Sequence, residues 1–518
     1  MHNLRFLKLY SSFCWEESNK VHVSQSNKVH VSQGLESIFN ELRYLQWNGC
    51  PLKSLQSNIQ PEKLVELEMP GSNVENLWSG VQQLANLKKI NLKRSKQLTS
   101  LPDLSKAQNL ESLDLSYCES LLAIPDCSDL KSLTTLYLSD CLKLTMLPQL
   151  PHNLQNLRLC KTPIEELPSS IEVLSRLVYL DLFHCSKLKC LPTSVCKWKS
   201  LEILTLVGCS KLDKFPDDIG TLNFLKYLRT TGTVLRELPS SITCLENLKL
   251  LSFGRIMGQD TIGCILPLLL HNLTFLYLEN CDITEVPDNL FSCLPSLEYL
   301  SLNENNFESI PSSIINLSNL KALNICNCKR LKVLPELPLI NIDASNCSSL
   351  EGLSYALRKI INYIDKDVET LPKSTVQLFY PGNEIPKWFD IRCTGSLIHA
   401  ELQPDWFNHN FVGFAFCAVA AFEDHPDANG YKDNIGILCD CFLKSKDGND
   451  SSVVGAFFLH HVDFNQSTHV FVGLYLTLYP CESLYYDNEV VFKFSLSENF
   501  DPIEDVKVEK CGVRLMYR

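Results

Sequence analysis

The first two thirds of the chain repeat one pattern of apolar and polar positions, Leu-x-x-Leu-x-Leu. The leading leucines are Leu4, Leu42, Leu64, Leu87, Leu110, Leu133, Leu154, Leu177, Leu201, Leu225, Leu248, Leu273, Leu297, Leu320 and Leu339. After a first gap of 38 residues, the step stays between 19 and 25 residues. The alternation within each segment predicts a short β-strand. The near-constant step predicts a solenoid, in which each repeat packs against its neighbours.

The eighth residue after each leading leucine is small and polar or thiol-bearing in all repeats but one. It is cysteine at Cys50, Cys118, Cys141, Cys185, Cys209, Cys281, Cys328 and Cys347. It is Asn305, or a hydroxyl residue at Ser12, Ser72, Ser95, Thr162 and Thr233, and Ile256 is the exception. Such a position turns the chain inward after the strand and bonds the backbone of the turn. We interpret these cysteines as small buried residues.

This step and this column are typical of leucine-rich repeats. Stacked strands would form a parallel sheet on the concave side of the solenoid. Leu-Pro steps recur in the second halves of the repeats, and proline disfavours helix at the residue before it. We therefore expect extended or 3₁₀ segments on the convex side, with brief helices in phrases such as PSSIEVLSRL. The predicted fold over residues 1–350 is an α/β leucine-rich-repeat solenoid of about 15 repeats.

A different pattern follows the last repeat. Residues 351–371 have helical spacing and predict a helical cap or connector for the open end of the solenoid. Residues 372–518 then predict an all-β antiparallel sandwich, since short β-type runs alternate with turn residues. The runs are VQLFY, SLIHAEL, FVGFAFCAV, IGILCDCFL, VGAFFLHHV, HVFVGLYLTLY, EVVFKFSL and GVRLMYR. Cys439 and Cys441 share one face of their strand, and we expect both to be packed.

Charge and composition narrow the class of protein. The formal net charge is −12, of which −9 falls after residue 371, and this argues against a nucleic-acid-binding protein. The 23 cysteines, without an export signal, fit reduced thiols better than a disulfide framework. No apolar run is long enough to span a membrane. These features predict a cytoplasmic location, with the nucleus as the second compartment.

Particular phrases resemble a known family. The segments LRYLQWNGCPLKSL (42–55), KLVELEMPGSNVENLW (63–78) and ELPSSI (166–171 and 237–242) are similar to the repeats of plant TIR-type nucleotide-binding leucine-rich-repeat disease resistance proteins. YPGNEIPKWF, GFAFCAV and VEKCGVRLMYR resemble the C-terminal jelly-roll/Ig-like (C-JID) domain of the same family. The resemblance implies the recognition and autoinhibition part of an intracellular immune receptor. Its partners would be pathogen effectors or guarded host proteins, and the TIR and nucleotide-binding domains of a complete receptor.

Two parts of such a receptor are not expected in this sequence. The phosphate-loop motif G-x-x-x-x-G-K-[ST] does not occur. The chain starts within a repeat, at MHNLRFLKL, which we read as a truncated gene product or gene model. The NAD-cleaving activity of the family's TIR domain should therefore not be carried over, and we expect neither enzymatic activity nor a cofactor.

Strand positions two, four and six after the leading leucine should point out from the concave face, called here the strand face. Aromatic side chains beside charges on such a face are typical of protein-binding surfaces. The candidate partner-binding residues are Tyr179, Asp181, Phe183, Tyr227, Arg229, Phe275, Tyr277, Glu279, Tyr299 and Asn303.

Other function classes have weaker signals. The pairs Cys326/Cys328 and Cys439/Cys441 lack zinc-site spacing, and the adjacent His460 and His461 would point in opposite directions on a strand, so we expect no metal site. One alternative is a leucine-rich-repeat ubiquitin ligase with a catalytic cysteine, suggested by the phrases LPQLP and LPELP. Another is an extracellular leucine-rich-repeat receptor-like protein, suggested by sequons at Asn272, Asn316, Asn346, Asn449 and Asn465.

Overall fold

Every Leu-x-x-Leu-x-Leu segment forms a strand that begins two residues after its leading leucine. The structure is a computed structural model that describes residues 5–9, 41–55, 61–78, 80–235, 239–254, 271–288, 290–338, 340–350, 376–408, 410–421, 435–445, 451–459, 468–475, 486–498, 501–502 and 508–517. It contains two compact units, Met1–Asn272 and Leu273–Arg518, called the first and second unit and described separately below.

The first unit stacks its repeat strands in parallel and in order, from β1 to β11. They are β1 (Phe6–Leu9), β2 (Tyr44–Trp47), β3 (Glu66–Glu68), β4 (Lys89–Asn91), β5 (Ser112–Asp114), β6 (Thr135–Tyr137), β7 (Asn156–Arg158), β8 (Tyr179–Asp181), β9 (Ile203–Thr205), β10 (Tyr227–Arg229) and β11 (Leu250–Gly254). The second unit begins with four more repeat strands, β12 (Phe275–Glu279), β13 (Tyr299–Ser301), β14 (Ala322–Asn324) and β15 (Asn341–Asp343). The predicted parallel repeat sheet is confirmed.

The leucines of the motif form the core of each repeat. Leu110, Leu113 and Leu115 are fully buried, and the residues on either side of Leu113 are half-buried. Strands β4, β6 and β8 likewise have one buried residue between two half-buried ones. Because side chains alternate along a strand, a row of apolar side chains lies in the core and a row of varied side chains lies on the strand face. Hydrophobic burial along this inner row is the main stabilising term of the solenoid.

The cysteine column lies inside, as predicted. All eight of its thiols are fully buried. Six of them donate to a backbone carbonyl of the preceding repeat, over sulfur–oxygen distances of 3.0–3.3 Å. Cys185, for example, donates to the carbonyl of Leu159 at 3.0 Å. At these six positions the column therefore joins neighbouring repeats through a small buried thiol that acts as a weak donor.

The residue before this column adopts a left-handed conformation in each repeat where it is described. Its φ is positive at Gly49, Gly71, Arg94, Tyr117, Asp140, Lys161, His184, Gly208, Gly232, Asn280, Glu304, Asn327 and Asn346. This conformation is unfavourable for residues with a Cβ, yet most positions in the row carry one. The sharp turn that brings the next residue into the core is therefore imposed by packing between repeats.

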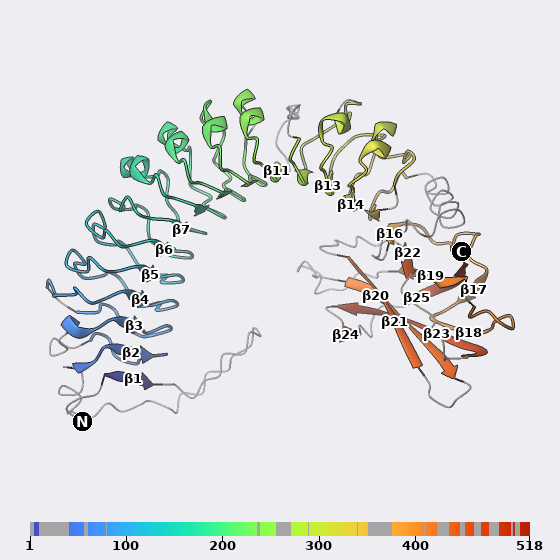
Figure 1. Ribbon diagram of the computed structural model, residues 1–518, viewed down its shortest axis with the longest axis horizontal. Coiled ribbons are helices and arrows are strands. Elements are labelled where there is room, and N and C mark those ends of the chain that lie inside the picture. Colours follow the sequence, from blue (N-terminus) through green and yellow to red (C-terminus); the bar gives the residue numbers. More distant parts are fainter. Residues whose placement is uncertain are drawn as a thin grey trace. The chain divides into compact units, whose positions relative to one another are not determined.

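The convex segments differ from one expectation. Short 3₁₀ turns occupy η3 (Pro61–Lys63), η4 (Ser169–Val173), η5 (Thr193–Lys197), η6 (Ile219–Thr221), η7 (Ser240–Cys244), η8 (Phe291–Cys293) and η9 (Ser312–Asn316). Figure 1 shows them on the side of the repeats opposite the strands. The described repeats contain no α-helix, so the helical part of the predicted α/β class is 3₁₀. A proline fixes the start of η4, η5, η7 and η9, and five residues are too few for a stable α-helix.

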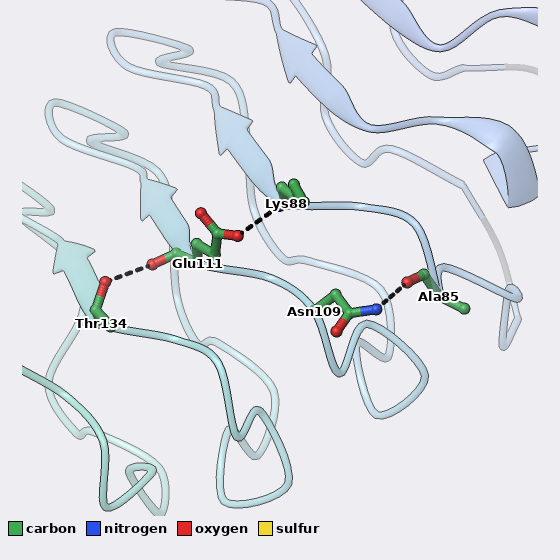
Figure 2. A network of polar contacts seen from close by, with 5 residues as sticks. All are labelled: Ala85, Lys88, Asn109, Glu111 and Thr134. Carbon is green, nitrogen blue, oxygen red and sulfur yellow. Dashed lines mark hydrogen bonds and ion pairs between the residues drawn. The ribbon is translucent and has the colours of Figure 1, made fainter.

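Polar ladders also connect the repeats (Figure 2). Asn109 donates from Nδ2 to the carbonyl of Ala85 at 2.7 Å, one repeat away. Lys88 pairs with Glu111 at 2.9 Å, and the hydroxyl of Thr134 donates to the backbone carbonyl of Glu111 at 3.2 Å. These contacts are exposed, so each contributes little to stability, but together they keep the repeats in register.

The C-terminal part is an antiparallel sandwich, as predicted. One sheet has the order β16 (Val376–Pro381), β22 (Thr468–Tyr475), β19 (Phe411–Ala421), β25 (Val508–Tyr517) and β17 (Ile391–Thr394). The other has the order β18 (Leu397–Glu401), β23 (Tyr486–Glu498), β20 (Ile435–Ser445) and β21 (Ser451–Leu459), and β24 (Asp501–Pro502) pairs with β23. All eight predicted runs form strands, whereas β17 and β24 were not expected.

Aromatic side chains from both sheets fill the sandwich. Phe414 of β19 packs edge-on against Phe492 of β23, with ring centroids 5.2 Å apart. Cys439 and Cys441 of β20 are fully buried in the same core, as expected.

The sandwich continues directly from the last repeat within the second unit. Strand β16 pairs in parallel with β15, and the amide of Ala344 donates to the carbonyl of Phe379 at 2.9 Å. The amide of Asn346 donates to Nε2 of the buried His469 at 3.2 Å. Asp343 of the strand face is the register partner of Phe379, which is buried in the sandwich core. The strand face of this unit therefore ends at β15. The predicted connector, 351–371, lies outside the described residues, and the domain boundaries at 350 and 372 stay predictions.

A loop after β16 is fastened to the outer side of β25. Lys510 donates to the carbonyl of Asn383 at 2.8 Å and pairs with Glu384 at 2.7 Å. Arg514 donates to the carbonyl of Trp388 at 2.9 Å. Gly512 lies between these two cations, and a Cβ on it would lie 2.9 Å from Cγ2 of Ile385. The segments NEIPKW (383–388) and KCGVR (510–514) therefore contact each other.

We expect Gly512→Ala to displace Ile385 and to lower the free energy of unfolding by about 1–3 kcal/mol, the usual cost of overpacking. Urea unfolding of the full chain measures this. The matched control is the same substitution in an Ile385→Ala background, where the closest contact is gone and the cost should fall. Equal costs in both backgrounds would refute the proposed contact.

Candidate protein-binding surface

In the first unit, the candidate residues lie on and after β8 and β10. Tyr179 and Tyr227 flank Ile203 in one row across the sheet, because both are its register partners. Phe183 follows β8 and contacts His184 edge-on at 4.3 Å. Of the candidates in this unit, Arg229 is exposed and the others are half-buried. The partial exposure of these side chains agrees with the predicted orientation on the strand face.

Tyr179 and Asp181 form a fixed polar pair. The Tyr179 hydroxyl donates to Oδ2 of Asp181 at 2.9 Å, and Oδ1 of Asp181 accepts from the amide of Phe183 at 3.1 Å. Burial raises the pKa of the Tyr179 hydroxyl to about 12, and the Asp181 carboxylate adds to the shift. The phenol therefore stays protonated and acts as a donor at neutral pH.

In the second unit, the candidates cluster on β12 and β13. The ring of Tyr299 lies 5.1 Å from that of Tyr277 and 6.5 Å from that of Phe275, measured between centroids. The hydroxyl of Ser301 lies 3.1 Å from the Glu279 carboxylate and 2.9 Å from Oδ1 of Asn303, either of which can accept its proton. Burial raises the pKa of Tyr299 to about 12.

The structure therefore divides the ten candidates into two groups of five, one in each unit. Both groups lie on the strand face of their own repeats, at the positions that the repeat predicts. Each combines rings with a charged or amide side chain at van der Waals or hydrogen-bond distance, which is the composition that binds protein partners.

The cysteines that raised other hypotheses are structural. Cys328 donates to the carbonyl of Leu302 at 3.2 Å, and burial raises its pKa to about 12. Burial also raises the pKa of Cys326, and that of Cys441 to about 12. Thiols shifted in this direction are poor nucleophiles and poor metal ligands. Within the described ranges no three His, Cys, Asp or Glu side chains are placed to hold a metal ion, and His460 and His461 lie outside those ranges.

No helix in the described part of the chain is both long and apolar enough to cross a bilayer.

Comparison with known proteins identifies both parts of the chain. Residues 380–518 match the C-JID domain, and residues 63–82 and 271–329 match leucine-rich repeats. Over its whole length the chain is 31% identical to the disease resistance-like protein DSC1 of Arabidopsis thaliana, of which it covers 48%. It is 30% identical to the disease resistance protein RPS4B of the same plant, of which it covers 43%. The chain is similar to plant disease resistance proteins over its whole length. The matched family models are those of leucine-rich repeats and the C-JID domain, as the resemblance predicted.

The chain spans less than half the length of DSC1 and RPS4B. Among solved structures it is similar to the leucine-rich-repeat protein LIC12759 of Leptospira interrogans, at 23% identity and a TM-score of 0.44. That match covers 64% of this chain and 96% of the other.

Two further residues of the strand face were not predicted from the sequence. Tyr137 and Arg158 occupy position four of successive repeats and are register partners on β6 and β7. The guanidinium of Arg158 lies 4.8 Å from the ring centroid of Tyr137 and 5.0 Å from that of Tyr179. Aligning the repeats by column would have shown that these side chains are neighbours, since position four of one repeat lies beside position four of the next.

Proposed function

We propose that the chain is the non-enzymatic recognition part of a plant immune receptor. In this proposal the strand faces and the C-JID domain bind a pathogen effector or a guarded host protein. The observation that carries it is the set of half-buried aromatic side chains on the strand faces, among which Tyr179 donates to the carboxylate of Asp181. Similarity to disease resistance proteins over the whole chain supports the biological setting.

The geometry of the second unit supports a protein partner. Phe275, Tyr277 and Tyr299 present three neighbouring rings beside the carboxylate of Glu279. Rings held by a rigid sheet lose little conformational entropy on binding, so their contact area contributes efficiently to affinity. Tyrosine is also enriched among the residues that dominate interface energies.

The receptor context adds a second role. In a complete receptor, the same region would hold a nucleotide-binding switch domain inactive until the partner arrives. The partner can activate the receptor only if it binds the open state more tightly than the closed state. We place this activity in the cytoplasm or the nucleus, where reduced thiols persist.

The two alternative functions gain no specific support. A ubiquitin ligase needs an activated cysteine, whereas burial raises the pKa of the column thiols, for example that of Cys185 to about 11. An exported receptor would carry sugars on its sequons. The amide nitrogen of Asn272 donates to the carbonyl of Glu246 at 2.8 Å, and that of Asn346 donates to Oδ1 of Asn327 at 3.1 Å, so both act in packing between repeats.

The test substitutes Tyr227, Phe275 and Tyr299 by aspartate, one at a time, in the full chain. A partner captured from infected tissue is purified and its affinity is measured by biolayer interferometry. If the partner contacts the group of candidate residues in one unit, aspartate in that group should weaken binding at least about 10-fold, or ~1.4 kcal/mol. The matched control is Phe224→Asp, because Phe224 is 57% exposed and lies outside the strand positions. Unchanged affinity in all three variants would refute binding by the strand faces.

A further inference from the structure

Arg158 is held between two aromatic rings in the middle of the first unit. Its guanidinium contacts the ring of Tyr137 from the strand on one side and the ring of Tyr179 from the strand on the other. Arg158 is exposed, whereas both tyrosines are half-buried. The two rings lie on either side of the guanidinium, and because Arg158 is exposed, its N–H groups can reach a ligand.

The carboxylate beside Arg158 in the same row is already engaged. Asp181 is the register partner of Arg158 on β8, yet its Oδ2 accepts from Tyr179 and its Oδ1 from the amide of Phe183. Among the described ion pairs, Arg158 has none. The sheet thus fixes a cation in place through rings rather than through a salt bridge.

We propose that Arg158 is an anchor for a carboxylate side chain on an acidic segment of the partner protein. This inference rests on the proposed function and specifies the chemistry of one contact in it. Arginine binds carboxylates through two parallel hydrogen bonds, and the two tyrosines position its fork before the partner arrives. Tyr137 and Tyr179 are the positioning residues.

Neighbouring charges favour a carboxylate over a polyanion. The same row of the sheet continues from Arg158 to Tyr137 and then to Asp114 on one side, and to Asp181 on the other. A phosphate dianion or a nucleic acid would approach both aspartates as well as the single cation. One carboxylate matches the single charge of Arg158 with the least repulsion.

The test uses four fluorescein-labelled peptides of equal length, carrying one glutamate, one glutamine, one phosphoserine or one lysine in a Gly/Ser background. Fluorescence anisotropy with the full chain gives their affinities at low and at moderate salt. We expect the glutamate peptide to bind tightest and Arg158→Gln to weaken it at least about 10-fold. Arg158→Lys keeps the charge but loses the fork, so it should restore only part of the affinity.

Arg176→Gln is the matched control. Arg176 is exposed in the same unit but directly precedes the leading Leu177, outside the strand positions and outside the candidate residues. We expect it to change glutamate-peptide binding less than about 2-fold. Tyr137→Leu should reproduce part of the Arg158→Gln loss. Equal losses in the two arginine variants, preference for the phosphoserine peptide, or no loss in Arg158→Gln would overturn the proposal.

Binding of the purified partner to the variants distinguishes a failure of this inference from a failure of the proposed function. Loss of binding in both the Tyr299→Asp and Arg158→Gln variants supports the inference. Loss in Tyr299→Asp alone leaves strand-face recognition standing and overturns the role of Arg158. Unchanged binding in every strand-face variant overturns both.

Discussion

Replacing Trp198 by alanine should lower the free energy of unfolding of the first unit by about 3–5 kcal/mol, the usual cost of removing a buried large aromatic side chain. Trp198 is fully buried at the end of η5. Its indole Nε1 donates to the carbonyl of Ile171 in the preceding repeat at 2.8 Å. The substitution therefore leaves a cavity and removes one of the two donors to the Ile171 carbonyl, which keeps the amide of Leu174 at 3.3 Å. Both effects act on the same contact between repeats.

Hydrogen exchange of the full chain, read at peptides from neighbouring repeats, measures this loss. Because each repeat contacts only its neighbours, protection should fall most near β8 and β9 and less with distance along the stack. Trp198→Phe is the control, since it keeps most of the volume and removes the hydrogen bond, at an expected cost of about 1–3 kcal/mol. Equal losses for alanine and phenylalanine would show that the cavity contributes nothing.

The repeat strands and the thiol column could be predicted because the sequence samples each position many times. A leucine at Leu113 alone is ambiguous, whereas the same leucine in every repeat fixes the side that faces the core. The eight C-terminal runs could be predicted for a similar reason, since long apolar stretches with β-branched and aromatic residues, such as Phe411–Ala421, have few other solutions. Their neighbours β17 and β24 are short, and the pattern of β17 is almost wholly exposed, so no apolar periodicity marks them.

The left-handed row could not be predicted from residue type. Glycine marks it at Gly208, but Tyr117 and His184 adopt the same conformation because the inward turn requires it. Tertiary packing overrides local preference here. The site is harder still, because its contacts join side chains from different repeats. Arg158 meets Tyr137 and Tyr179 across three strands, and only the register makes them neighbours.

Asn305→Ala should lower the free energy of unfolding of the second unit by roughly 2–5 kcal/mol, because one buried side chain satisfies several backbone groups. Its Oδ1 accepts from the amides of Cys281 and Ile283, at 3.1 and 3.0 Å. Its Nδ2 donates to the carbonyls of Leu278 and Leu302, at 2.7 and 2.8 Å. Alanine removes the side-chain acceptor of two buried N–H groups, and no other side chain of the column makes this set of bonds in the described repeats. Urea unfolding of the full chain measures the loss.

Asn305→Cys is the informative control, since cysteine is the usual residue of this column. A thiol here can donate to the carbonyl of Leu278, as Cys328 does to that of Leu302. It cannot accept from two amides at once. Where the next repeat has a cysteine in the column, the amide equivalent to that of Cys281 donates within its own repeat. The amide of Cys118, for example, donates to the carbonyl of Leu115 at 3.1 Å. We therefore expect a smaller loss for cysteine than for alanine. Equal losses, or an alanine loss below about 1 kcal/mol, would mean that the amide network is not what holds this turn.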